Sequence, residues 1–166
     1  MSSETSRCRP RLAKYCKGNG LDIGYGGDPI VSDAITIDLR HPYARLGDVP
    51  KNLAGDARDL RWFKDGVLDY VYSSHLLEDF EDTGAVLREW LRVLKYGGLF
   101  VLFGPDEQIY KTHCRQTGQP YNHGHKIADF GLSYVKSILA QINAGEIIHE
   151  VPLIDDYNFE LVIRKK

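Results

Sequence analysis

Residues 20–28 constrain the fold of this chain more than any other stretch, because a short apolar run leads directly into a turn that is nearly free of side chains. Leu21 and Ile23 alternate with Asp22, and glycines follow at positions 24, 26 and 27. A buried strand that ends in such a turn lets a ligand approach the backbone itself. Because ligands of α/β proteins bind beyond the carboxyl ends of parallel strands, we expect a nucleotide-like cofactor here. Asp22 is placed to accept hydrogen bonds from an amine-bearing ligand.

The composition is that of an ordinary globular chain. Its 166 residues suit one domain covering residues 1–166, with 43% hydrophobic and 27% charged residues. A net charge of −2 gives no reason to expect attraction to nucleic acid or to a membrane surface. The three cysteines are odd in number and lack C-x-x-C spacing, which favours a reducing compartment over a disulfide framework. Since no run reaches membrane-spanning length and the start carries no signal-like segment, we expect a cytoplasmic protein.

Short apolar runs alternate with segments of helical period, which indicates an α/β sheet. Strands are expected at residues 21–24, 34–39, 53–56, 68–73, 99–103, 147–151 and 158–164. Helices are expected at residues 7–17 with a basic, solvated face, at 83–96 before Gly97-Gly98, and at 132–143. The last two strands flank a short turn and predict an antiparallel hairpin. Residues 104–130 show no clear period and are predicted to form a long loop with at most one helical turn.

Acids follow three successive strands of this pattern. Asp38 ends the strand next to the glycine turn, where a carboxylate can accept both hydroxyls of a ribose. Asp56 ends the third strand, where it can accept a hydrogen bond from an adenine amino group while the Ala57 amide donates to the ring. Taken singly, each acid is more often a helix cap or turn residue. Together with Asp22, however, they favour a nucleoside site.

These motifs, in this order, resemble the class I S-adenosylmethionine-dependent methyltransferases in their small, single-domain, methyltransferase type 11-like form. The likeness is carried by residues 21–26, 37–38, 55–57, 69–80 and 92–100. It implies S-adenosyl-L-methionine as cofactor. It also implies an α/β, Rossmann-like class I methyltransferase fold, whose seven-stranded sheet is mostly parallel and ends in an antiparallel C-terminal hairpin.

The resemblance and the strand ends together predict the cofactor contacts, which are Asp22, Gly24, Tyr25, Gly26, Asp38, Leu39, Asp56, Ala57, Ser73 and Ser74. Three departures from the family pattern stand out. Asp28 occupies the place of a third glycine, and Asp79 stands where a histidine is common. The nine residues between Gly24 and Ala34 are too few for the usual crossover helix, so we expect that helix to be shortened or missing.

Methyl transfer requires chiefly that the acceptor be aligned with the sulfur–methyl bond and that water be excluded. A hydroxyl acceptor also needs a general base. The candidates are His75, after the fourth strand, and His123 and His125 in the irregular segment, although each is more often a structural residue. A metal held by histidines of that segment and Cys114 is the weaker alternative, because their spacing matches no standard closed site. We therefore predict no metal.

The predicted function is methyl transfer to a small-molecule acceptor, such as a hydroxyl of a sugar, a saccharide lipid or a secondary metabolite. No nucleic-acid or membrane partner is expected, and the protein is predicted to be a monomer or homodimer. Two alternatives remain. One is a non-catalytic, methyltransferase-like module that binds the cofactor or a partner. The other is an NAD-dependent oxidoreductase, which is disfavoured because Pro29 replaces the third glycine of its motif.

Overall fold

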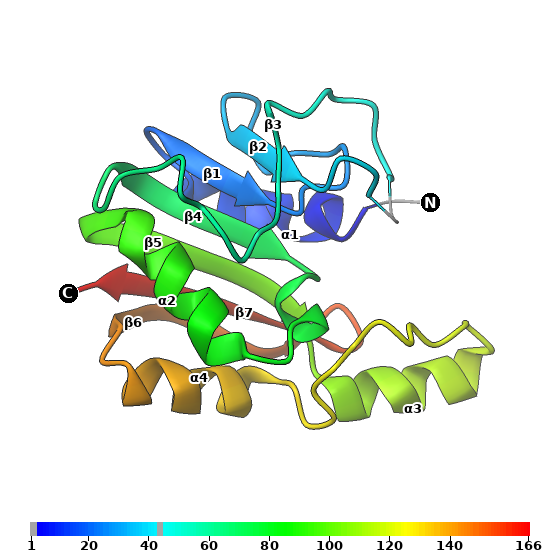
Figure 1. Cartoon of the computed structure of the whole chain (residues 1–166). Coiled ribbons are helices and arrows are strands. Elements are labelled where there is room, and N and C mark those ends of the chain that lie inside the picture. Colours follow the sequence, from blue (N-terminus) through cyan, green and yellow to red (C-terminus); the bar gives the residue numbers. More distant parts are fainter. Residues whose placement is uncertain (1–2, 43–44) are drawn as a thin grey trace.

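The computed structural model describes residues 3–42 and 45–166 and is built around one seven-stranded sheet (Figure 1). The strand order is β3-β2-β1-β4-β5-β7-β6. All neighbouring strands pair in parallel except β7, which is antiparallel to both β5 and β6. The strands are β1 Gly20–Ile23, β2 Ile35–Asp38, β3 Leu53–Ala54, β4 Leu68–Ser74, β5 Leu94–Pro105, β6 Gly145–Ile154 and β7 Asn158–Lys165. The predicted sheet and its C-terminal hairpin are therefore confirmed.

Helices cover both faces of the sheet (Figure 1). They are α1 Glu4–Leu12, α2 Thr83–Val93, α3 Glu107–Thr117 and α4 Leu132–Gln141, with single 3-10 turns η1 Ala13–Tyr15 and η2 Leu77–Asp79. On one face, α2 and α4 bury a core that contains Trp90 and Phe100. On the other face, α1 packs against Tyr72 and Phe103. Among the described residues, no helix has the length and apolarity needed to cross a bilayer.

The connection from β1 to β2 contains turns and no helix, as predicted from its length. The segment after β2 folds back on the glycine turn and stabilises it in place of a helix. The Leu46 and Val49 amides donate to the Gly26 and Gly27 carbonyls at 2.7 and 3.1 Å, and the Tyr25 hydroxyl donates to the Val49 carbonyl at 2.5 Å. The turn is thus held by backbone hydrogen bonds from a segment about twenty residues further along the chain.

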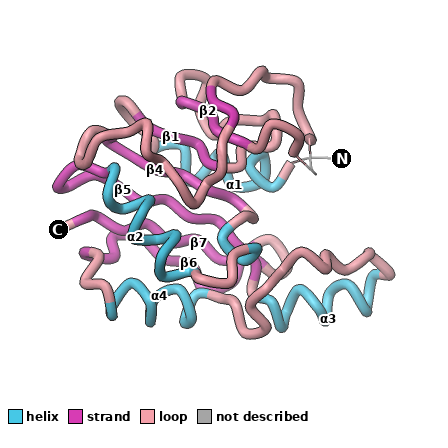
Figure 2. Tube along the Cα trace, in the orientation of Figure 1, coloured by secondary structure: helices cyan, strands magenta, loops and turns pink. Residues whose placement is uncertain are grey.

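The prediction for residues 104–130 is wrong in its first half, because α3 is a helix of 11 residues. Asp106 caps its N-terminus by accepting from the Gln108 and Ile109 amides, and Gly118 ends it at φ +73°. Few apolar residues mark the helix in the sequence, since it buries only a narrow stripe through Tyr110 and Cys114. Helix α3 and the loop after it extend beyond the carboxyl ends of the strands (Figure 2).

The predicted end of α2 is also wrong. The helix stops at Val93 rather than at the glycine pair, because Leu94 takes an extended conformation and pairs with Leu68 of β4. Gly97, at φ +76°, instead lies inside the first part of β5. Strand β5 thereby gains length at the expense of the helix.

The predicted first helix begins too late, and its solvated basic face is wrong. Helix α1 starts after Ser3, whose hydroxyl accepts from the Ser6 amide. Its arginines form ion pairs instead of facing water. The pairs join Arg7 to Glu4 and Asp156, Arg9 to Asp28, and Arg11 to Asp155 and Glu160. They tie α1 to the β1–β2 connection and to the turn of the hairpin.

Candidate functional site

A cleft opens at the carboxyl ends of β1, β2, β3 and β4. It consists of two adjoining cavities that share Gly24, Asp38 and Leu76. The cavities enclose about 580 and 650 Å³, counting space open to solvent, which lies within the range of small-ligand and cofactor sites. Of the predicted cofactor contacts, the cleft is lined by Gly24, Tyr25, Gly26, Asp38, Leu39, Asp56, Ala57 and Ser74.

The glycine turn forms the floor between the two cavities. Gly24 and Gly26 have φ values of +71° and +59°, a conformation that residues with a Cβ rarely adopt. A Cβ on Gly24 would lie 2.7 Å from Leu76 Cδ2, whereas a Cβ on Gly26 would meet no atom within 4 Å. Gly26 also lines the first cavity. The protein therefore leaves space over the backbone at Gly26, where a ligand can make close contact.

Asp38 lies where the two cavities meet. Its Oδ2 accepts from the Gly26 amide at 3.2 Å, and its Oδ1 accepts from the Leu39 amide at 2.8 Å. A carboxylate offers about four acceptor positions, so two remain for a ligand. The same side chain can therefore shape the glycine turn and bind a pair of hydroxyl groups.

The second cavity extends from Asp38 to the turn after β3. Arg58 donates to Asp56 through Nη2 at 2.6 Å and through Nε at 3.0 Å. These hydrogen bonds hold the pKa of the Asp56 carboxyl below its usual range. The Ala57 carbonyl accepts from Trp90 Nε1 at 2.8 Å, which anchors the turn to α2. Sequence reasoning did not identify Arg58, which pairs with the carboxylate that was predicted to bind the adenine.

Two predicted contacts, Asp22 and Ser73, lie beneath the cleft and do not line it. Ser73 Oγ donates to the Ile23 carbonyl at 3.2 Å and so joins β4 to β1. Asp22 is fully buried and accepts from the Ile30 amide at 2.7 Å, while its Oδ1 has no hydrogen-bond partner within residues 3–42 and 45–166. Burial raises the pKa of Asp22 to about 8.

This buried acid predicts a specific pH dependence of stability. Between pH about 4 and about 8, folded Asp22 holds a proton that the unfolded chain releases, so the free energy of unfolding decreases as pH rises through this window. Asp22→Asn removes the titrating group. The free energy of unfolding of the variant minus that of the wild type, measured by urea denaturation, should therefore increase steadily from pH about 4 to pH about 8. Asp33→Asn, at an exposed position, is the control. A difference in free energy of unfolding that stays constant with pH would contradict the raised pKa of Asp22.

His75 follows β4 and lines the first cavity beside Ser74 and Glu4. It adopts φ +50°, and its Nε2 lies 2.9 Å from Asn158 Oδ1 and 3.5 Å from Glu4 Oε2. Burial holds the pKa of the imidazole below its usual value, so the ring is neutral at physiological pH. Sequence reasoning missed both Glu4 and Asn158, which come from α1 and β7 and are far from His75 along the chain.

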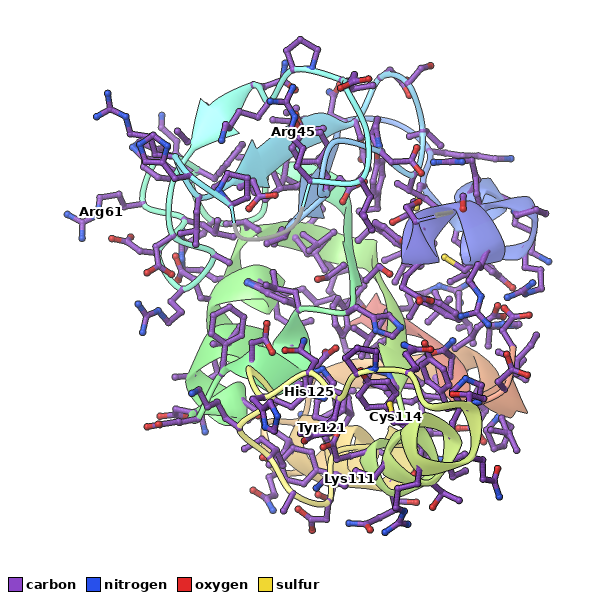
Figure 3. The ribbon with its side chains drawn as sticks, turned by 90° about the vertical axis from the view of Figure 1, so that its right-hand side faces the viewer. Arg45, Arg61, Lys111, Cys114, Tyr121 and His125 are labelled. Carbon is purple, nitrogen blue, oxygen red and sulfur yellow. The ribbon has the colours of Figure 1, made fainter. Side chains whose placement is uncertain are left out.

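The other two predicted bases lie outside the cleft lining. His125 is buried, and its Nδ1 lies 2.7 Å from Glu107 Oε2. His123 is exposed and packs edge-on against the ring of Tyr121. Figure 3 shows His125 and Tyr121 together beside α3, in the lower half of the view, with Arg45 near the top. The rings of Tyr110 and Tyr121 pack around His125.

The residues considered for a metal do not converge. Among the residues that the structure describes, no group of three or more His, Cys, Asp or Glu side chains is arranged to hold a metal ion. The ring of His113 packs against Tyr157, and the Cys114 thiol faces the Pro120 carbonyl. The polar groups that line the cleft include the glycine backbone, the carboxyl groups of Asp38 and Asp56, and His75.

A mostly parallel sheet, a glycine turn and acids at successive strand ends are together the features of the class I methyltransferase fold. Comparison with known proteins agrees. A family model described as a methyltransferase domain matches residues 21–102. Together with the fold, this match confirms the predicted resemblance to the class I S-adenosylmethionine-dependent methyltransferases. A search of curated proteins finds no significant match.

Solved structures share the fold at low sequence identity. The PH0226 protein of Pyrococcus horikoshii is 21% identical with a TM-score of 0.73, covering 97% of this chain and 90% of its own. An S-adenosylmethionine-dependent methyltransferase of Archaeoglobus fulgidus is 18% identical with a TM-score of 0.70, and the match covers 97% of this chain and 92% of that protein. A complex of the Trm112 methyltransferase activator and a methyltransferase of Haloferax volcanii matches at 15% identity and a TM-score of 0.68, covering 98% and 88%.

Proposed function

We propose that this protein binds S-adenosylmethionine in the cleft and transfers its methyl group to a small-molecule acceptor. The observation that carries the proposal is the open space over Gly26, in a cleft that also contains acids from two neighbouring strands. Asp38 would bind the ribose, and Asp56 with Ala57 would bind the adenine. Ser74 would also bind the cofactor, because its hydroxyl is buried beside the first cavity and has no hydrogen-bond partner among the described residues. Asp22 and Ser73 would then support the site from below.

The acceptor would enter the first cavity, whose wall contains Glu4 and His75. S-adenosylmethionine, when bound, supplies an activated methyl group, so the protein's main task is to align the acceptor and exclude water. A neutral His75 can take the proton of a hydroxyl acceptor, typically worth 10²–10⁴-fold in rate. His123 and His125 would act indirectly, since neither lines the cleft. Such a protein would act as one cytoplasmic domain, as a monomer or homodimer.

Isothermal titration calorimetry of the purified chain tests cofactor binding. We expect S-adenosylmethionine and S-adenosylhomocysteine to bind and NAD to give no heat, because the β1–β2 connection lacks the crossover helix of dinucleotide-binding proteins. Binding of NAD alone would overturn the proposal. Transfer of labelled methyl groups to a panel of hydroxylated and amine-bearing small molecules then tests catalysis.

A matched pair of glycine substitutions tests where the cofactor lies. Gly26 and Gly118 both have positive φ, and at both positions a Cβ would meet no atom within 4 Å. Gly26→Ala and Gly118→Ala should therefore each cost about 1–2 kcal/mol of stability through backbone strain. Gly26→Ala should also weaken S-adenosylhomocysteine binding at least about tenfold, because the methyl group occupies the space over the turn. Equal affinities for the two variants in calorimetry would place the ligand elsewhere.

The second candidate is a non-catalytic module that binds the cofactor and serves a partner protein. Two observations favour it. Asp79 stands where the family commonly has a histidine, and the methyltransferase of Haloferax volcanii was solved in complex with an activator protein. Cofactor binding without methyl transfer to any acceptor in the panel would support this candidate.

A further inference from the structure

Behind His75 lies a buried group of side chains that the proposed binding site does not use. Its centre is Glu78 of η2, which is only 1% exposed. Neither carboxyl oxygen of Glu78 has a hydrogen-bond partner among the described residues. Its Oε1 nevertheless lies 3.7 Å from His75 Nδ1 and 3.9 Å from His125 Nε2. A carboxyl group thus sits between two imidazole rings, one of which lines the cleft.

The tautomer of His75 follows from its neighbour in β7. Asn158 Nδ2 donates to the Asp155 carbonyl at 3.2 Å, which fixes the orientation of the amide. Asn158 Oδ1 therefore faces His75 Nε2, at 2.9 Å, and accepts a hydrogen bond from the N–H group at that position. In a neutral ring, His75 Nδ1 is then a bare acceptor, and it points toward Glu78.

The tautomer of His125 is assigned in the same way. Glu107 accepts from Lys111 Nζ at 3.2 Å and from the Tyr121 hydroxyl, so it is a carboxylate that receives hydrogen bonds. Its Oε2 lies 2.7 Å from His125 Nδ1, which therefore carries a proton. His125 Nε2 is then a second bare acceptor, and it also faces Glu78.

Three acceptor atoms consequently face one another in a space shielded from water. An ionised Glu78 between two bare nitrogens would be a buried charge without compensation, which is strongly unfavourable. One proton among the three groups removes the conflict, because it turns one acceptor into a donor. We propose that Glu78, His75 and His125 share one proton, and that Glu78 is the positioning residue that sets the protonation of His75.

The surrounding charges support this assignment. Burial, and then the carboxylates of Asp79, Glu107 and Glu4, raise the pKa of Glu78 well above its usual value. The charged and titratable groups that face Glu78 or His75 are Glu4 and Arg7 of α1, Asp79 of η2, Glu107 of α3, Tyr157 of the hairpin turn and His125 of the loop after α3. Acids outnumber cations in this set, which favours retention of the proton.

The consequence for methyl transfer rests on the proposed function. When the shared proton lies on His75 Nδ1, an ionised Glu78 balances it, as the carboxylate of a catalytic triad does. The Nε2 proton can then pass to the Glu4 carboxylate, whose Oε2 lies 3.5 Å away, and this leaves Nε2 bare to accept a proton from a substrate hydroxyl. Sequence reasoning could not identify Glu78 in this role, because a glutamate in a short turn gives no sign of its burial.

Titration of the full chain by nuclear magnetic resonance tests the shared proton without any cofactor. Carbon-labelled glutamate and histidine side chains would be followed from pH about 4 to about 9. We expect the Glu78 carboxyl to titrate at clearly higher pH than that of Glu81, an exposed glutamate just after η2. His75 and His125 should each show two inflections, because interacting groups titrate as one system.

Two variants complete the test. Glu78→Gln should remove the second inflection from both histidines, whereas the control Glu81→Gln should leave both curves unchanged. The proposal is overturned if Glu78 titrates together with Glu81, or if folded Glu78→Gln retains the wild-type histidine curves. Should Glu78→Gln fail to fold, the carboxyl titration of the wild type decides alone. Because cofactor binding is measured separately, either proposal can fail without the other.

Discussion

Replacement of Trp90 by alanine is expected to lower the free energy of unfolding by about 3–5 kcal/mol. Trp90 is fully buried on the face of the sheet covered by α2 and α4. Its ring packs against Phe80 and Phe100, with centroids 6.4 and 6.0 Å away. Its removal leaves a cavity that neighbours anchored in η2, α2 and β5 cannot refill. It also frees the Ala57 carbonyl, so the adenine-facing turn should loosen.

The second tryptophan of the chain provides the control. Trp62 is 53% exposed, so Trp62→Ala should cost less than about 1 kcal/mol in the same urea denaturation. Trp90→Phe retains most of the buried ring but loses the hydrogen bond to Ala57. We expect it to be more stable than Trp90→Ala and yet to bind the cofactor more weakly than the wild type. Similar stability losses for Trp62→Ala and Trp90→Ala would show that Trp90 does not hold the core.

Asp38→Ala is expected to weaken S-adenosylhomocysteine binding by about 1–3 kcal/mol, or roughly 5–150-fold. The variant leaves the ligand's ribose hydroxyls without their acceptor. It also removes the side-chain bonds to the Gly26 and Leu39 amides, which shape the glycine turn. Calorimetry gives the affinity, and thermal unfolding without ligand separates a loss of contacts from a loss of folding.

Asp48→Ala is the matched control, because Asp48 is an exposed acid on the segment that covers the turn. It should leave the affinity unchanged. Asp38→Asn keeps one acceptor oxygen and should fall between the wild type and Asp38→Ala. Wild-type affinity in folded Asp38→Ala would remove the ribose contact from the proposed site.

The lining of the cleft around the glycine turn was predictable because its signals are local. A glycine turn directly after an apolar run, and an acid at the end of the next strand, are each read from a few adjacent residues. Parallel strands then bring those ends to one edge of the sheet without further information. Asp38 and Gly26 line the same cavity for this reason.

The acceptor side was not predictable in the same way. Helix α3 escaped notice because it buries a narrow stripe, and its neighbours come from distant segments. Glu107, Glu78 and His125 meet only because the loop after α3 packs over η2, with the Lys126 amide donating to the Glu78 carbonyl at 2.8 Å. The arginines of α1 were assigned to solvent for a similar reason, since three of their acidic partners, Asp155, Asp156 and Glu160, lie at the far end of the chain.

The sequence by itself determined the seven strands, the absence of a helix after β1, and the placement of Asp38 and Asp56 at strand ends that line the cleft. Each of these follows from residue type and spacing within about ten positions. Tertiary structure alone decided which groups lose water and which charges then meet. Burial raises the pKa of Asp22 and of Glu78, and packing between distant segments places His75 in the wall of the cleft. Desolvation depends on everything packed around a group, and no local pattern of residues records it.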